Sequence, residues 1–99
     1  MALQTVHPLI RDPRQPTQHA LDPLRIAGQT IHLSLTIRCD DDGAWRGRLR
    51  FVNELEAGRE RRTAEIFCGA SEEELWTAVG HLRDHHLRDL YRALESTDR

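Results

Sequence analysis

The sequence contains no lysine, and all fourteen of its basic residues are arginine, a bias that indicates a GC-rich bacterial genome. Acidic residues number 16, so the formal net charge at pH 7 is -2. Proteins that coat nucleic acids or adsorb to membrane surfaces usually carry a clear excess of positive charge. The composition therefore excludes a general role of that kind, while a local cationic patch stays compatible with it.

Cysteine is also scarce, since Cys39 and Cys68 are the only two in 99 residues. Two cysteines do not make a disulfide framework, and we expect both to be reduced structural thiols. No apolar run approaches the roughly 18 residues that span a bilayer, and the N-terminal sequence MALQTVHPLIRDP lacks the basic start and apolar core of a secretory signal. We therefore expect a cytoplasmic protein.

Proline is confined to the first quarter of the chain, at positions 8, 13, 16 and 23. Each proline interrupts a helix or a central strand. Residues 1–23 are therefore predicted to form an extended or flexible arm, and residues 24–96 a single domain. Within that domain, LRIAGQ is compatible with a short edge strand before Gly28.

Two segments alternate between apolar and polar residues with the period of a β-strand. The first is TIHLSLTIRC, residues 30–39, and the second is AWRGRLRFV, residues 44–52. The sequence DDDG between them suits a tight hairpin, because Asp42 and Gly43 tolerate the positive φ angles of such a turn. We therefore predict an antiparallel pair of strands.

A third strand is predicted at RRTAEIFC, residues 61–68. Its alternation assigns Ala64, Ile66 and Cys68 to the inner face. The same alternation places Phe67 on the outer face, which is unusual for a large apolar side chain.

The sequence GASEEELW is typical of a helix N-terminus, with Ser71 as N-cap and Glu74 completing a capping box. One long helix is predicted from residue 72 to about residue 95. The residues of its apolar stripe are Leu75, Trp76, Val79, Leu82, Leu87, Leu90 and Leu94. The fold class predicted is α+β, with a three- to four-stranded antiparallel sheet packed on one long C-terminal helix.

Three histidines near the C-terminus raise the question of a metal site. His81 and His85 lie four residues apart on the polar side of the predicted helix, whereas His86 falls in the apolar stripe. A zinc site requires three or four ligands, and no such set is visible. Cys68 precedes the helix N-cap, but its predicted inward orientation favours an inert thiol. We predict no metal site, no cofactor and no catalytic residue, with a small metal- or thiol-dependent enzyme as an alternative.

The arginines of the second strand form the most informative pattern, because antiparallel pairing places them on one face with polar residues of the first strand. The residues of this predicted partner-binding surface are Arg38, Arg46, Arg48, Arg50 and His32. Three interpretations stay open. The arginines keep one face of the sheet soluble, they pair with carboxylates of a partner chain or of the protein's own acidic loops, or they contact the phosphates of RNA or DNA.

The order of these elements resembles the small β-β-β-α domain of HicB-like antitoxins. The resemblance covers residues 30–95, and the matching residues are Asp42, Gly43, Trp45, Gly69, Ser71, Glu73 and Glu74. It implies a partner-binding domain that neutralises a small basic toxin.

A domain of about 75 residues, with one helix covering one face of its sheet, has a small core that supplies only a few kcal/mol of net stability. We therefore also expect a homodimer. The function predicted is a small, non-enzymatic protein-interaction module.

Overall fold

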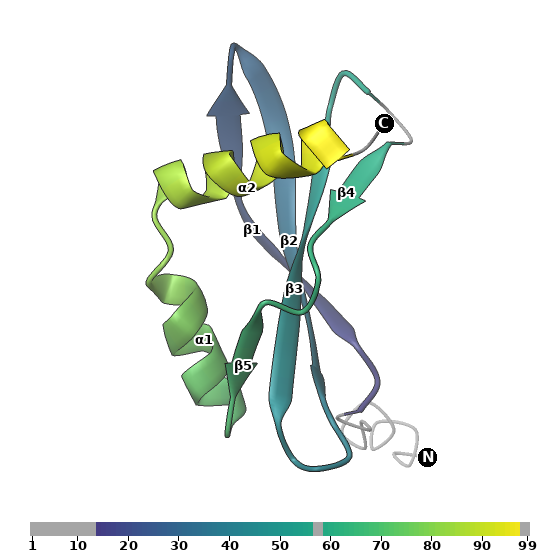
Figure 1. Ribbon diagram of the computed structural model, residues 1–99, viewed down its shortest axis with the longest axis vertical. Coiled ribbons are helices and arrows are strands. Elements are labelled where there is room, and N and C mark those ends of the chain that lie inside the picture. Colours follow the sequence, from purple (N-terminus) through teal and green to yellow (C-terminus); the bar gives the residue numbers. More distant parts are fainter. Residues whose placement is uncertain (1–13, 57–58, 98–99) are drawn as a thin grey trace, which may run out of the picture.

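The computed structural model describes residues 14–56 and 59–97. These residues form an antiparallel sheet followed by two helices (Figure 1). The elements in chain order are β1 (Thr17–Ile26), β2 (Gln29–Cys39), β3 (Trp45–Asn53), β4 (Glu60–Arg62), β5 (Phe67–Gly69), α1 (Glu72–Gly80) and α2 (Asp84–Thr97). The predicted α+β class and the antiparallel sheet are confirmed, with five strands and two helices.

The strands pair in the order β1-β2-β3-β4, and β5 also pairs with β3. The far edge of β3 is thus shared by two short strands, β4 beside Arg50–Val52 and β5 beside Trp45–Gly47. Thr63 bridges the gap between them, because its backbone N–H donates to the Leu49 carbonyl at 3.0 Å and its hydroxyl accepts from the Leu49 N–H at 3.0 Å. The third predicted strand is therefore split into two.

Two tight turns connect the three long strands. Ala27 and Gly28, with φ angles of 52° and 79°, join β1 to β2 in the positive-φ conformation of a two-residue hairpin. Gly43 supplies the positive φ, 88°, of the turn between β2 and β3, and its N–H donates to the Asp40 carbonyl at 2.9 Å. The predicted hairpin between the two alternating segments is confirmed.

Both helices pack on the same side of the sheet, where α1 lies beside β5 and α2 crosses the long strands (Figure 1). Most of the residues that the alternation of β2 and β3 assigned to this side are buried in the core. The buried apolar residues are Leu24, Ile31, Leu33, Leu35, Ile37, Leu49, Phe51, Phe67, Leu75 and Tyr91. In the part of the chain that the structure describes, no helix covers the opposite side, which we call the open face.

The prediction of one long helix is wrong, because α1 ends at Gly80 and α2 begins at Asp84. The break has local causes. The Leu82 N–H bonds to the Val79 carbonyl at 3.1 Å, a tighter turn than an α-helix makes, and His86 Nδ1 accepts a hydrogen bond from the Arg83 N–H at 3.1 Å. The change of direction brings α2 across the strands, and the predicted stripe packs against the core from both helices.

The predicted orientation of the third strand is also wrong. Phe67 is buried, while Ile66 is 46% exposed and Cys68 is exposed. Phe67 lies opposite Gly47 of β3. A Cβ at Gly47 would meet Leu35, Ile37 and Leu75, so this position faces the core. Phe67, opposite it, points to the same side and Cys68 to the open face. Residues 63–66 do not form a strand, so the alternation predicted from the sequence does not continue through them to Phe67.

The extended arm predicted for residues 1–23 differs from the structure over its second part. Residues 17–23 belong to β1, a strand ten residues long, where the sequence indicated only a short strand before Gly28. The register of β1 against β2 shifts between Leu21 and Leu24, so that Pro23 occupies an irregular position on an edge strand. Residues 1–13 lie outside the described part of the chain. Neither α1 nor α2 has the length and apolar character that a membrane-crossing helix needs.

Candidate functional site

The register of β2 against β3 places the arginines of both strands on the open face. Arg46 lies opposite Arg38, Arg48 opposite Thr36, and Arg50 opposite Ser34. The residues that alternate with them along β2 and β3 point into the core, so the four predicted arginines share one surface. His32 belongs to the same face, opposite Val52. The structure thus brings together all five residues that the sequence assigned to a partner-binding surface.

Arg38 is held by a carboxylate from the connection between β4 and β5. Its Nε and Nη2 donate to the two carboxylate oxygens of Glu65 at 2.7 and 2.8 Å, a bidentate pair. A second carboxylate, that of Asp40, lies 3.3 Å from Arg38 Nη1. These contacts fix the guanidinium plane against the sheet.

Two further arginines are held in the same way. Arg46 Nε donates to Asp40 Oδ2 at 2.9 Å, and Arg50 Nε donates to Glu60 Oε1 at 2.8 Å. Glu60 Oε2 also lies 3.1 Å from Arg62 Nε. The cationic row that the sequence suggests is therefore a surface of alternating charges, which we call the arginine lattice. Its residues are Arg38, Arg46 and Arg50 with Glu65, Asp40 and Glu60.

The carboxylates of this lattice stay ionised over a wide range of pH. Hydrogen bonding from Arg46 lowers the pKa of Asp40, hydrogen bonding from Arg50 lowers that of Glu60, and hydrogen bonding from Arg38 lowers that of Glu65. The same contacts raise the pKa values of the three arginines. A pairing of the arginines with the protein's own acidic loops is one of the interpretations that the sequence leaves open, but the sequence does not identify the carboxylates. A register for the third strand would have placed Glu60 beside β3.

Arg48 differs from its neighbours. It lies near the middle of β3, half-buried, and its side chain forms no hydrogen bond or ion pair with any residue that the structure describes. Arg48 interacts electrostatically with Glu65, whose carboxylate is already bonded to Arg38. Arg48 is thus a donor group between Arg38, Arg46 and Arg50, whose guanidinium groups have carboxylate partners.

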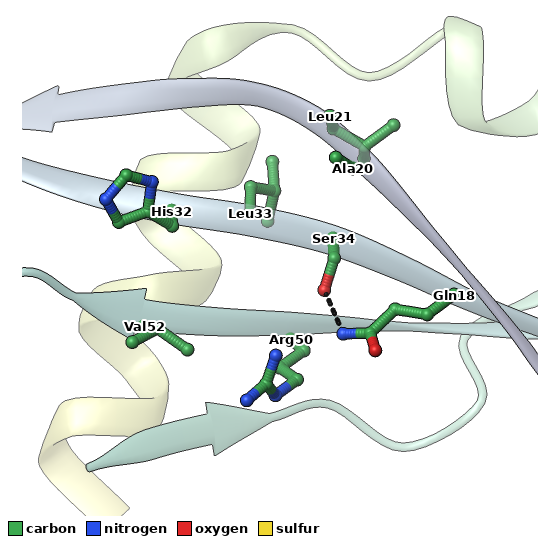
Figure 2. Close-up of a pocket in the computed structure, with 8 residues that line it drawn as sticks. All are labelled: Gln18, Ala20, Leu21, His32, Leu33, Ser34, Arg50 and Val52. Carbon is green, nitrogen blue, oxygen red and sulfur yellow. Dashed lines mark hydrogen bonds between the residues drawn. The ribbon is translucent and has the colours of Figure 1, made fainter. Parts of the chain in front are cut away.

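A hollow of about 380 Å³ opens beside this lattice, on the side of β1 (Figure 2). It is lined by Gln18, Ala20, Leu21, His32, Leu33, Ser34, Arg50 and Val52. Gln18 Nε2 donates to Ser34 Oγ at 2.9 Å across its floor, as the dashed line in Figure 2 shows. His32 Nε2 lies 3.1 Å from Glu54 Oε2 at the rim. The hollow offers both apolar surface and hydrogen-bonding groups.

No family model, curated protein or solved structure matches the chain. The role of the open face is therefore argued from its geometry.

The two cysteines and the histidines of the C-terminal segment do not gather at one point. Cys68 pairs in register with Arg46 and so points to the open face, whereas His81, His85 and His86 belong to the helical side. The rings of His85 and His86 have centroids 4.0 Å apart, and His86 Nδ1 is bonded to the Arg83 N–H. In residues 14–56 and 59–97 no three histidine, cysteine or acidic side chains form a group that could hold a metal ion.

Proposed function

We propose that this protein is a non-enzymatic interaction domain that binds another polypeptide with the open face of its sheet. One observation carries the proposal: a face of β2 and β3 that no other described element covers bears arginines that are fixed by carboxylates of the same chain. Among residues 14–56 and 59–97, Arg48 has no such partner.

The fixed arginines favour binding because they lower its entropic cost. A long side chain that becomes immobile in an interface loses about 0.5–1.5 kcal/mol of rotamer freedom. Arg38, Arg46 and Arg50 are ordered before a partner arrives, with only 31–37% of each side chain exposed. Their aliphatic stems cover the strands and present apolar area, and arginine is enriched in the cores of protein interfaces.

The lattice of charges favours a polypeptide over a nucleic acid. Phosphates that approach Arg38, Arg46 or Arg50 also approach Glu65, Asp40 and Glu60, and the like charges repel. Single-stranded nucleic acids further require aromatic platforms for their bases. Over the described strands, the aromatic residues Trp45, Phe51 and Phe67 lie on the helical side.

A partner that fits this face carries charges of both signs. A carboxylate pairs with Arg48, while basic and hydrogen-bonding groups pair with the lattice carboxylates and with Ser34 and Thr36 at the sheet surface. The HicB-like role, in which the partner is a small basic toxin, is a special case of this proposal. There the partner's basic residues contact Asp40, Glu60 and Glu65.

The experiment compares capture by the wild type with capture by Arg48→Glu. Each protein is immobilised and exposed to a lysate of the cells that encode it, after nuclease treatment, and captured proteins are identified and their affinities measured. Arg48→Glu is expected to weaken binding of the captured partner roughly tenfold or more, since it places a carboxylate where a partner carboxylate docks. Arg92→Glu, an exposed position on α2, is the matched control.

Equal binding of one partner by the wild type and Arg48→Glu contradicts the proposal. So does capture that nuclease abolishes. Binding of a short RNA or DNA probe that falls steeply with salt and is lost in Arg48→Glu supports the nucleic-acid interpretation instead.

A further inference from the structure

One edge of the sheet is formed by β1, which pairs with β2 along one side only in the part of the chain that the structure describes. From Thr17 to Leu21 this strand runs in regular register against Ile37 to Leu33. Pro16 precedes this stretch, and Asp22 and Pro23 follow it at the register shift. The outer backbone groups of Thr17–Leu21 therefore form a short, regular edge with defined ends.

Exposed edges of this kind normally carry features that prevent pairing with another strand. Such features are charged side chains, prolines, bulges or a very short strand. The stretch TQHAL, residues 17–21, contains no charged residue, no proline and no glycine. Asp22, Pro23 and the register shift protect the second half of β1, but the first half lacks that protection.

Hollows flank this edge on both sides of the sheet. On the open face lies the hollow of about 380 Å³ that Gln18 and Ala20 help to line (Figure 2). On the helical side a second hollow, of about 340 Å³, is lined mostly by apolar side chains, among them Leu21, Leu24, Val79 and Leu87. A strand added beside residues 17–21 places its open-face side chains over the first hollow, while the second hollow meets this stretch only at Leu21.

We propose that two copies of the chain pair antiparallel through residues 17–21 of β1, about a two-fold axis perpendicular to the sheet. Backbone N–H and C=O groups of the two edges are then complementary by symmetry. The axis keeps Gln18 and Ala20 of both copies on the open face and His19 and Leu21 on the helical side. Because the stretch is uncharged, a second copy brings no like charge to the contact.

The pairing joins the two sheets into one continuous sheet with both open faces on the same side. The contact is short, so it buries less area than a standard interface and gives a dissociation constant in the micromolar range. The contact between the β1 edges does not include Arg48 or the arginine lattice. The test of the dimer and the test of the proposed function can therefore give different outcomes.

The test is the mass of the full chain by sedimentation at protein concentrations up to about 100 µM. The variant Gln18→Lys/Ala20→Lys places lysines near their own copies across the axis, and it is expected to raise the dissociation constant roughly tenfold or more. Both positions are exposed, so the fold tolerates the change. Ala70→Lys/Thr77→Lys, at two exposed positions away from the edge, controls for added charge.

Hydrogen exchange of the wild type gives a second measurement that needs no variant. Amides of residues 17–21 that point away from β2 are expected to exchange more slowly as protein concentration rises, because pairing covers them. A wild type that stays monomeric at about 100 µM overturns the inference. So does a dimer that the edge lysines leave unchanged, or exchange in residues 17–21 that does not depend on concentration.

Discussion

At the scale of single residues, the open face depends on carboxylates that stand far from the arginines in the sequence. Glu65 lies 27 positions after Arg38 and meets it through two hydrogen bonds, at 2.7 and 2.8 Å. Asp40 contacts both Arg38 and Arg46. The guanidinium groups of Arg38 and Arg46 are thereby paired with carboxylates, and a row of positive charge becomes an ordered surface of mixed charge.

Glu65 gives this lattice a predictable dependence on pH. Its pKa is lowered from the ordinary value of 4.5, chiefly by the hydrogen bonds from Arg38. A carboxyl with a lowered pKa in the folded state stabilises the fold above its unfolded pKa and loses that contribution as pH falls through the folded value. We expect Glu65→Gln to be less stable than the wild type near pH 7, with a difference that shrinks below about pH 4.5.

Urea unfolding at about pH 7 and about pH 3 measures both differences. Glu95→Gln removes a carboxyl from α2 that has no guanidinium partner among the described residues, and so it controls for the loss of one titrating group. A constant gap between the wild type and Glu65→Gln over this range of pH would show that Arg38 and Glu65 do not stabilise the fold as an ion pair.

The positions of the arginines followed from the sequence, but their partners did not. A period of two residues decides which side chains of a strand share a face, so Arg46, Arg48 and Arg50 could be grouped from their spacing alone. Glu65 lies in irregular backbone, where no period applies. Its contact with Arg38 depends on how β5 pairs with β3, and spacing along the chain does not contain that information.

At the scale of elements, the contact between β5 and the start of α1 depends on Gly69. A Cβ atom at this position would lie 2.9 Å from the Leu75 backbone nitrogen, 3.0 Å from Glu74 Cβ and 3.1 Å from the Ser71 carbonyl oxygen. Two of these three atoms belong to the backbone at the helix N-terminus. This close approach places Leu75, which is fully buried, in the core.

We therefore expect Gly69→Ala to lower the free energy of unfolding by about 1–3 kcal/mol, because the backbone of α1 must shift to make room. Gly80→Ala is the matched control, since a Cβ there meets nothing within 4 Å. Its stability is expected to stay unchanged or to rise by up to about 1 kcal/mol. Equal stabilities of the two variants in thermal or urea unfolding would contradict this account of the contact.

The elements that the sequence predicted best are those with strong periodicity. The alternation of β2 and β3 and the capping residues of α1 were confirmed, with Ser71 Oγ accepting from the Glu74 N–H at 3.2 Å. The full length of β1 was missed because Asp22 and Pro23 interrupt its alternation. The break before α2 was missed because Leu82 and Leu87 continue the apolar stripe on both sides of it.

At the scale of the whole molecule, one side of the sheet carries the core, and no helix of the described residues covers the other side. α2 is fixed across the strands by Tyr91, which is buried against Phe51 and whose hydroxyl accepts a hydrogen bond from Asn53 Nδ2 at 3.3 Å. The layer order followed from the sequence, since apolar residues on alternate strand positions and on a helix stripe must face each other. The number of strands did not follow, because β4 and β5 are too short to show a period.

The open face and the edge of β1 are separate surfaces, and this separation leads to a prediction about the two sets of variants. Arg48 lies on β3, whereas Gln18 and Ala20 lie on β1, with β2 between them. A dimer that forms through the edges leaves both copies of Arg48 uncovered. We therefore expect Arg48→Glu to have the same dissociation constant for self-association as the wild type and Arg92→Glu, measured by sedimentation over the same concentrations.

A dimer built by stacking two open faces behaves in the opposite way, because it buries Arg48 of each copy against the lattice of the other. Loss of the dimer in Arg48→Glu, together with an unchanged dimer in Gln18→Lys/Ala20→Lys, would therefore assign self-association to the open face, and the surface that we propose for a partner would then be occupied by a second copy of the chain.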